Sequence, residues 1–91
     1  MDELKALKNI GPKMARMLLA VGITSPQELA KTGSRETWLR LVAIDPSTWT
    51  TMLMALEGAV QGVSLKELGE DSKASLRMFS REQKKLLKAK A

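Results

Sequence analysis

The residues best suited to chemistry lie near the start of the chain, where a tight turn leads into a helix. Pro12 is typical of a first helical position, because proline lacks the N–H that would be unpaired there, and Gly11 permits the turn before it. The backbone N–H groups at such a helix start point outward without partners and form an anion site. Lys13 stands one residue inside this site, so the stretch predicts binding of a phosphate group.

Six residues at and around this turn are the candidate contacts with DNA phosphates. They are Lys8, Asn9, Ile10, Gly11, Lys13 and Arg16. The backbone amides would hold the phosphate and the basic side chains would add charge, and asparagine tolerates the left-handed backbone that a tight turn needs. Such contacts do not depend on base sequence and weaken as salt rises. The open alternative is that the turn only packs two helices together and that its charges are solvated.

The composition excludes most catalytic chemistry. The 91 residues include no Cys and no His, which removes thiol chemistry, disulfides, soft metal sites and the commonest general base. No metal-ligand spacing and no phosphate-binding P-loop occur in the sequence. Glu57 is the one acidic residue within a strongly apolar segment, and we expect it to accept hydrogen bonds from a neighbouring helix N-terminus or from Arg40. The chain is therefore predicted not to be an enzyme, with no catalytic residues, no cofactor and no metal.

Positive charge is concentrated at the C-terminal end of the chain. The net charge is +5, yet residues 72–91 hold seven basic side chains and one acidic side chain, whereas residues 1–71 hold eight basic and nine acidic side chains. The high isoelectric point is therefore no evidence that the body of the domain binds nucleic acid. The basic segment either follows a DNA backbone or keeps a methionine-rich domain in solution, and both explanations are open.

Helix signals account for most of the chain, and no segment alternates between apolar and polar residues as a β-strand does. We therefore expect an all-α fold. Ser25 and Ser64 are expected to cap helix starts, each with a glutamate three residues later, and Ser34 is expected to cap a third. The prediction is a small bundle of about five short helices followed by a basic helix or tail, which is divided or bent if Ser80 acts as a cap. The expected helices span 2–8, 12–20, 26–31, 35–43 and 48–61, with a short turn at 64–68.

The segment 48–61 is predicted to be the central and most buried helix. Its apolar face comprises Trp49, Met52, Leu53, Leu56, Ala59, Val60 and Val63. Gly58 within it costs about 1 kcal/mol relative to alanine, so its presence predicts close contact with another helix. We assign residues 1–69 to a helical domain and residues 70–91 to a basic helical or partly disordered tail.

Neither a membrane span nor a secretory signal is present in the sequence. No apolar run approaches the roughly 18 residues that a membrane-spanning helix needs, and the first residues are acidic. We therefore expect a cytoplasmic protein that makes no membrane contact. Its six methionines either fill the core or form a surface for a protein partner, and the sequence leaves the oligomeric state open.

The turn resembles the hairpin of the helix-hairpin-helix motif, Leu-Pro-Gly-Ile-Gly-Pro-Lys-x-Ala. Leu7, Ala15 and the run 10–13 match this pattern. Lys8 and Asn9 replace its first proline and its first glycine. In that family the hairpin amides and the lysine bind a nucleic-acid phosphate without reading sequence. The resemblance implies the same role for the amides and the lysine of this turn.

Residues 4–68 as a whole resemble the C-terminal domain of the TfoX/Sxy family of competence regulators. Three blocks carry the resemblance, namely 4–18 with 21–25, 38–41 and 53–63, and the last is close to the family's Leu-Glu-Gly-Ala-x-x-Gly signature. The resemblance implies an all-α domain with helix-hairpin-helix character. Family members usually carry a further N-terminal α/β domain, which implies that this chain is an excised piece or a stand-alone module.

The resemblance to this family also implies a function and a partner. It indicates a bacterial module that regulates transcription of genes for natural competence and DNA uptake and acts with the cyclic-AMP receptor protein. Contacts of the hairpin with DNA phosphates would then be part of that role. The alternative is a module that binds other proteins and makes no direct contact with DNA, in which the hairpin is purely structural.

Overall fold

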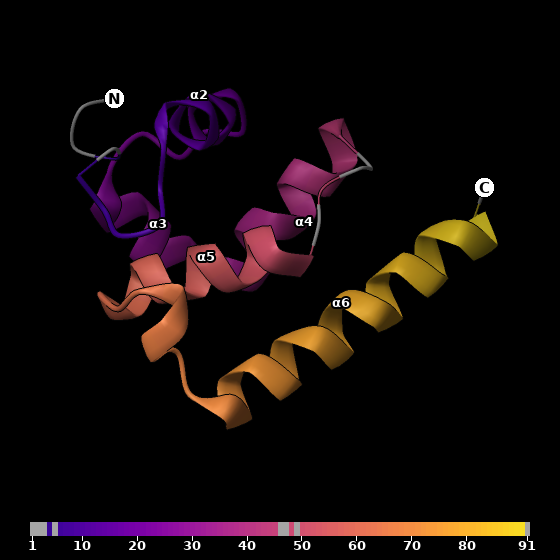
Figure 1. Cartoon of the computed structure of the whole chain (residues 1–91). Coiled ribbons are helices and arrows are strands. Elements are labelled where there is room, and N and C mark those ends of the chain that lie inside the picture. Colours follow the sequence, from indigo (N-terminus) through magenta and orange to yellow (C-terminus); the bar gives the residue numbers. More distant parts are fainter. Residues whose placement is uncertain (1–3, 5, 46–47, 49, 91) are drawn as a thin grey trace.

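The chain folds into helices over the part that the structure describes. The structure is a computed structural model, and it describes residues 4, 6–45, 48 and 50–90. Those residues contain five α-helices and one 3-10 helix but no strand, which confirms the predicted all-α fold. The elements, shown in Figure 1, are α2 (Pro12–Ala20), α3 (Pro26–Thr32), α4 (Ser34–Ile44), α5 (Thr50–Gln61), the 3-10 helix η1 (Leu65–Glu67) and α6 (Glu70–Lys90).

In the segment before α2, Leu4 is helical, but the predicted helix over 2–8 does not extend to residue 8. Residues 6–9 form turns, in which the N–H of Leu7 bonds to the carbonyl of Leu4 at 3.1 Å, and residues 1–3 and 5 lie outside the described residues. Asn9 has a φ of 71°, so the chain reverses there and cannot continue a right-handed helix. The turn and the second helix of the motif are present, but a complete helix-hairpin-helix motif is not confirmed.

Several helix starts agree with their local sequence signals. The helix α3 begins at its predicted proline, and the Ser25 hydroxyl accepts a hydrogen bond from the N–H of Glu28 at 3.2 Å. Ser64 and Glu67 form the predicted capping box before η1, with the Glu67 carboxylate accepting from the N–H of Ser64 at 3.0 Å. Each signal acts within four residues, so it can be recognised without knowledge of the rest of the fold.

The start of α4 does not agree with prediction. The helix begins at Ser34 itself, and the N-cap is Gly33, which has a φ of 87°. The Ser34 hydroxyl caps no backbone group and instead donates to the Glu57 carboxylate on α5 at 2.6 Å. The predicted cap at Ser34 is therefore wrong, because a charged acceptor on another helix makes the stronger hydrogen bond.

The helix α5 is the central helix, as predicted. It packs against α3, α4, η1 and α6, and Figure 1 shows it between the N-terminal helices and α6. Its buried residues are Leu53, Ala55, Leu56, Gly58 and Ala59. Three members of the expected apolar face, Met52, Val60 and Val63, are only partly buried. Trp49 lies outside the described residues, and the helix is described from Thr50.

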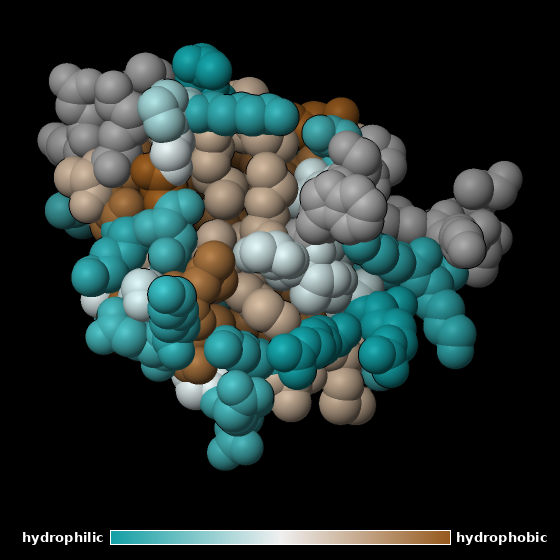
Figure 2. Space-filling view, viewed as in Figure 1, coloured by the Kyte–Doolittle hydropathy of each residue, from teal (hydrophilic) through white to brown (hydrophobic). Residues whose placement is uncertain are grey.

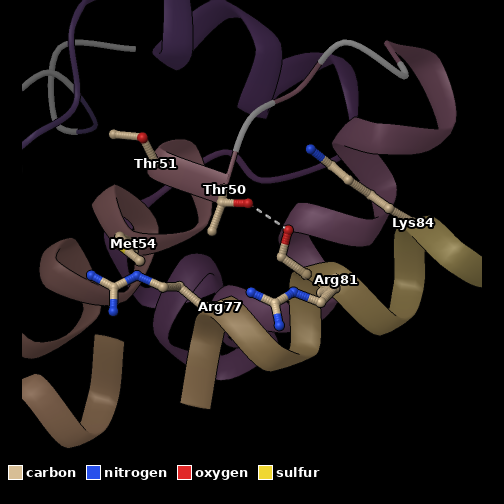
Figure 3. Close-up of a pocket in the computed structure, with 7 residues that line it drawn as sticks. Thr50, Thr51, Met54, Arg77, Arg81 and Lys84 are labelled. Atoms are coloured by element: carbon tan, nitrogen blue, oxygen red, sulfur yellow. Dashed lines mark hydrogen bonds between the residues drawn. The ribbon is translucent and has the colours of Figure 1, made fainter. Parts of the chain in front are cut away.

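The basic C-terminal segment is one continuous helix, α6, and its first half packs on the core. Leu76 and Ser80 are each 1% exposed, and the ring of Phe79 meets that of Trp38 edge-on with centroids 6.1 Å apart. The Ser80 hydroxyl shares a hydrogen bond of 2.7 Å with that of Thr50 on α5 (Figure 3). Ser80 therefore joins two helices, and its predicted role as an internal helix cap is wrong.

Candidate nucleic-acid interface

The N-terminus of α2 is the exposed end of the hairpin turn. Gly11 is its N-cap residue, with φ −90° and ψ 178°, and no side chain among the described residues caps the first turn. Pro12 contributes no N–H, and the N–H of Ala15 already bonds to the carbonyl of Gly11 at 2.9 Å. The amides of Lys13 and Met14 lack intrahelical partners at this position. The local geometry is that of an uncapped helix N-terminus.

Three basic side chains surround this helix N-terminus, and all three residues are exposed. Lys13 and Arg16 are three residues apart on α2, so their side chains share one face of the helix. Lys8 lies in the turn on the other side of Gly11 and faces the carboxylate of Glu67. The pKa of Glu67 is lowered first by its hydrogen bonds from Ser64 and then by the positive charge of Lys8. The charge of Lys8 therefore acts partly on Glu67, and Lys13 and Arg16 place two further positive charges on one face of α2.

The side chain of Asn9 points into the protein. Its amide group donates hydrogen bonds to the carbonyls of Val63 at 3.0 Å and Ala55 at 3.4 Å, and its oxygen accepts from the N–H of Leu65 at 3.3 Å. These contacts join the hairpin turn to the middle of α5, to the chain just after α5 and to the start of η1, and we call them the Asn9 clasp. Because the side chain of Asn9 is hydrogen-bonded within the protein, only its backbone could contact a phosphate.

Ile10 is also directed inward. Its side chain is 5% exposed and belongs to the hydrophobic core, and its N–H bonds to the carbonyl of Leu7 at 3.3 Å. Of the six predicted contact residues, the structure therefore brings Lys8, Gly11, Lys13 and Arg16 to the surface around one turn. Asn9 and Ile10 hold that turn on the core.

Gly58 makes the Asn9 clasp possible. A Cβ atom at this position would lie 2.6 Å from Nδ2 of Asn9 and 2.8 Å from the carbonyl oxygen of Val63. The predicted close approach is present, but the approaching groups are a side chain of the hairpin turn and the chain after α5, not another helix. The pair of Asn9 and Gly58 was missed in the sequence, although a turn asparagine and a glycine inside a helix were each visible.

Glu57 holds α5 against the start of α4. One carboxylate oxygen accepts the hydroxyl of Ser34 at 2.6 Å, and the other accepts the side-chain amide of Gln61 at 2.6 Å. This confirms the first predicted partner, a neighbouring helix N-terminus. Arg40 bonds instead to Glu36 and to the carbonyl of Val21, each at 3.3 Å. The contacts of Glu57 are those of a structural carboxylate.

The comparison with protein families decides the affiliation of the chain. The sequence model of the TfoX C-terminal domain matches residues 1–80. The chain belongs to the TfoX C-terminal domain family. This family is a non-catalytic domain family, and its match extends through the first half of α6 to Ser80. The assignment of residues 70–91 to a separate tail stays a prediction.

Two solved structures resemble this TfoX C-terminal domain over nearly its whole length. A crystal structure of an uncharacterized protein from Listeria monocytogenes, in a triclinic form, has 40% identity and a TM-score of 0.87 and covers 88% of this chain and 91% of that one. A crystal structure of a protein of unknown function from Listeria monocytogenes, in a tetragonal form, has 40% identity and a TM-score of 0.85. It covers 87% of this chain and 98% of that one. The comparison with curated proteins finds no match.

Two further kinds of site were sought in this TfoX C-terminal domain. Among the described residues, no group of three or more His, Cys, Asp or Glu side chains gathers in a way that would hold a metal ion. No helix in that part of the chain is both long and apolar enough to cross a bilayer. The hairpin surface is therefore the candidate that both the sequence and the geometry indicate.

Proposed function

We propose that this TfoX C-terminal domain is a non-enzymatic regulatory module that contacts DNA phosphates through the N-terminus of α2. The observation that carries the proposal is an exposed helix N-terminus that no described side chain caps, with Lys13 and Arg16 on one face beside it. In keeping with the family, the module acts in transcriptional regulation of competence and DNA-uptake genes, with the cyclic-AMP receptor protein as a partner regulator. Its contacts with DNA are independent of base sequence.

Within the proposed interface the residues have separate roles. The amides of Gly11 and Lys13 donate to a phosphate oxygen, and the side chains of Lys13 and Arg16 add charge. Asn9 and Ile10 fix the turn from beneath through the contacts described above. The α2 N-terminus thus has a rigid support, and DNA binding costs little additional ordering of the chain.

A duplex-DNA titration at low and moderate salt tests this proposal. We expect Lys13→Glu to weaken the affinity for a short duplex roughly tenfold at low salt, because it replaces attraction to a phosphate by repulsion. Lys31→Glu is the matched control, since Lys31 is exposed on α3 and lies outside the hairpin. Equal affinities for the two variants would show that the hairpin is not the site.

A second candidate function rests on an apolar hollow beside the hairpin. It is about 500 Å³ in volume and is lined in part by Asn9, Met14, Met52 and Leu65. Methionine surfaces adapt well to protein partners, so this hollow favours a protein-interaction module with a purely structural hairpin. Absence of DNA binding at either salt concentration would support this second function.

A further inference from the structure

A basic groove separates α5 from α6. A hollow of about 500 Å³ lies between Thr50 and Thr51 of α5 and the side chains of Arg77, Arg81 and Lys84 of α6 (Figure 3). An adjoining hollow of about 270 Å³ shares Thr51, Met54 and Arg77 with it and extends to Lys66 and Lys73. Because the two hollows share these three lining residues, we treat them together as the α5–α6 groove.

The wall that α6 contributes to this groove is a row of cations. Lys73, Arg77, Arg81 and Lys84 recur every three or four residues, so they lie on one face of the helix over a length of about 16 Å. No acidic residue is among the described residues that line either hollow. Lys73 has a carboxylate neighbour, Glu70, at 3.7 Å. Figure 2 shows hydrophilic side chains along α6 beside a less polar strip over α5.

The row of cations is held on a fixed support. Leu76 packs into the core, and the hydrogen bond between Ser80 and Thr50 ties α6 to the first turn of α5. Arg77 and Arg81 follow these two buried residues directly in sequence, and both are exposed. A ligand in the groove would therefore meet cations whose helix needs no rearrangement.

The groove and the hairpin lie on the same side of α5. Thr51 lines the α5–α6 groove and also the apolar hollow that Asn9 and Met14 border at the hairpin. One extended ligand could therefore touch the α2 N-terminus and the cations of α6 together. A single small anion would use only part of such a surface.

We propose that the α5–α6 groove is a second site for the phosphate backbone of duplex DNA. The proposal rests on the function proposed above, in which this domain contacts DNA. A linear row of cations is complementary to a linear polyanion, and Thr51 adds an exposed hydroxyl that can donate to a phosphate oxygen. An acidic protein segment fits less well, because Met54 and Leu65 are the only large apolar side chains among the described lining residues to anchor it.

The test compares two double variants with the wild-type chain by titration of a short duplex over a range of salt concentrations. Arg77→Gln with Arg81→Gln alters the groove, and Lys31→Gln with Lys85→Gln is the control of equal charge, since neither Lys31 nor Lys85 lines the groove. Each phosphate contact contributes about 0.9 to the slope of log K against log salt, so the groove variant should lower the slope by about 1.8. The control should leave it close to the wild-type value.

A third variant, Lys13→Gln with Arg16→Gln, separates this inference from the proposed function. If the hairpin variant lowers the slope and the groove variant matches the control, the groove inference is overturned and the proposed function stands. If only the groove variant lowers the slope, the groove is the DNA site and the hairpin proposal fails. A higher affinity of the groove for a poly-glutamate peptide than for duplex DNA, at the same salt concentration, would also overturn the inference. Circular dichroism verifies that each variant is folded.

Discussion

At the scale of single residues, one asparagine determines how the candidate interface is presented. Asn9 adopts a left-handed backbone conformation with φ 71°, and its side-chain amide donates hydrogen bonds to the carbonyls of Ala55 and Val63. The hairpin motif that this turn resembles has a glycine there, which would permit the backbone but could make none of these bonds. Gly58 completes the arrangement because any side chain at that position would occupy the place of the Asn9 amide.

The contribution of the Asn9 clasp can be measured with two substitutions. Asn9→Gly keeps the left-handed backbone accessible but removes the hydrogen bonds, so it should lower the free energy of unfolding by about 1–3 kcal/mol. Asn9→Ala removes the same bonds and adds roughly 1–2 kcal/mol of backbone strain. Urea denaturation of both variants gives the two values. A stability of Asn9→Gly equal to wild type would show that the clasp contributes nothing net.

At the scale of elements, local signals predicted where helices begin, and long-range contacts decided the rest. The starts of α2 and α3, and the capping box of Ser64 and Glu67, depend on neighbouring residues and were predictable. Ser34 also carries a cap signal, but its hydroxyl bonds to Glu57, 23 residues away in sequence. The sequence alone does not indicate that the Ser34 hydroxyl bonds to Glu57 rather than to a backbone N–H of its own helix.

The candidate site was predictable to a similar extent. The turn, the helix start and the exposed basic residues follow from the run 8–16, whereas the inward direction of Asn9 depends on contacts 46 to 56 residues away. The sequence also divided the chain at residue 70, because residues 69–71 interrupt the helical pattern and the basic excess follows them. It could not show that Leu76 and Ser80, placed among basic residues, are buried where α6 packs on α5.

The packing of α6 leads to a test at the same scale. Leu76 is 1% exposed, so Leu76→Ala should leave a cavity and lower the free energy of unfolding by about 2–5 kcal/mol. Met78 is two residues away and 62% exposed, and Met78→Ala should change stability by less than about 0.5 kcal/mol. Chemical denaturation of both variants measures the difference. Equal small changes would indicate that α6 is a tail and adds no stability to the helical body.

At the scale of the whole molecule, the positive charge and the fold are arranged around α5. The hairpin is fastened by the Asn9 clasp to the middle of this helix and to the chain just after it, and α6 is fastened to its N-terminal turn by Ser80. The attachment of α6 places basic side chains on the side of α5 where Thr51 is exposed, and Asn9 and Met14 border the apolar hollow that Thr51 also lines. The net charge of +5 alone does not predict this arrangement, since most of the excess belongs to residues 72–91.

If a DNA phosphate binds at the N-terminus of α2, the backbone amide resonances of that turn report the contact directly. Titration of the ¹⁵N-labelled chain with a short duplex should shift the N–H signals of Gly11 and Lys13 and leave that of Lys31 on α3 unchanged. The shifts should diminish as salt is added, because the contact is electrostatic. A duplex that binds while the signals of Gly11 and Lys13 stay in place, or a duplex that does not bind at all, would show that the N-terminus of α2 is not a DNA-binding site.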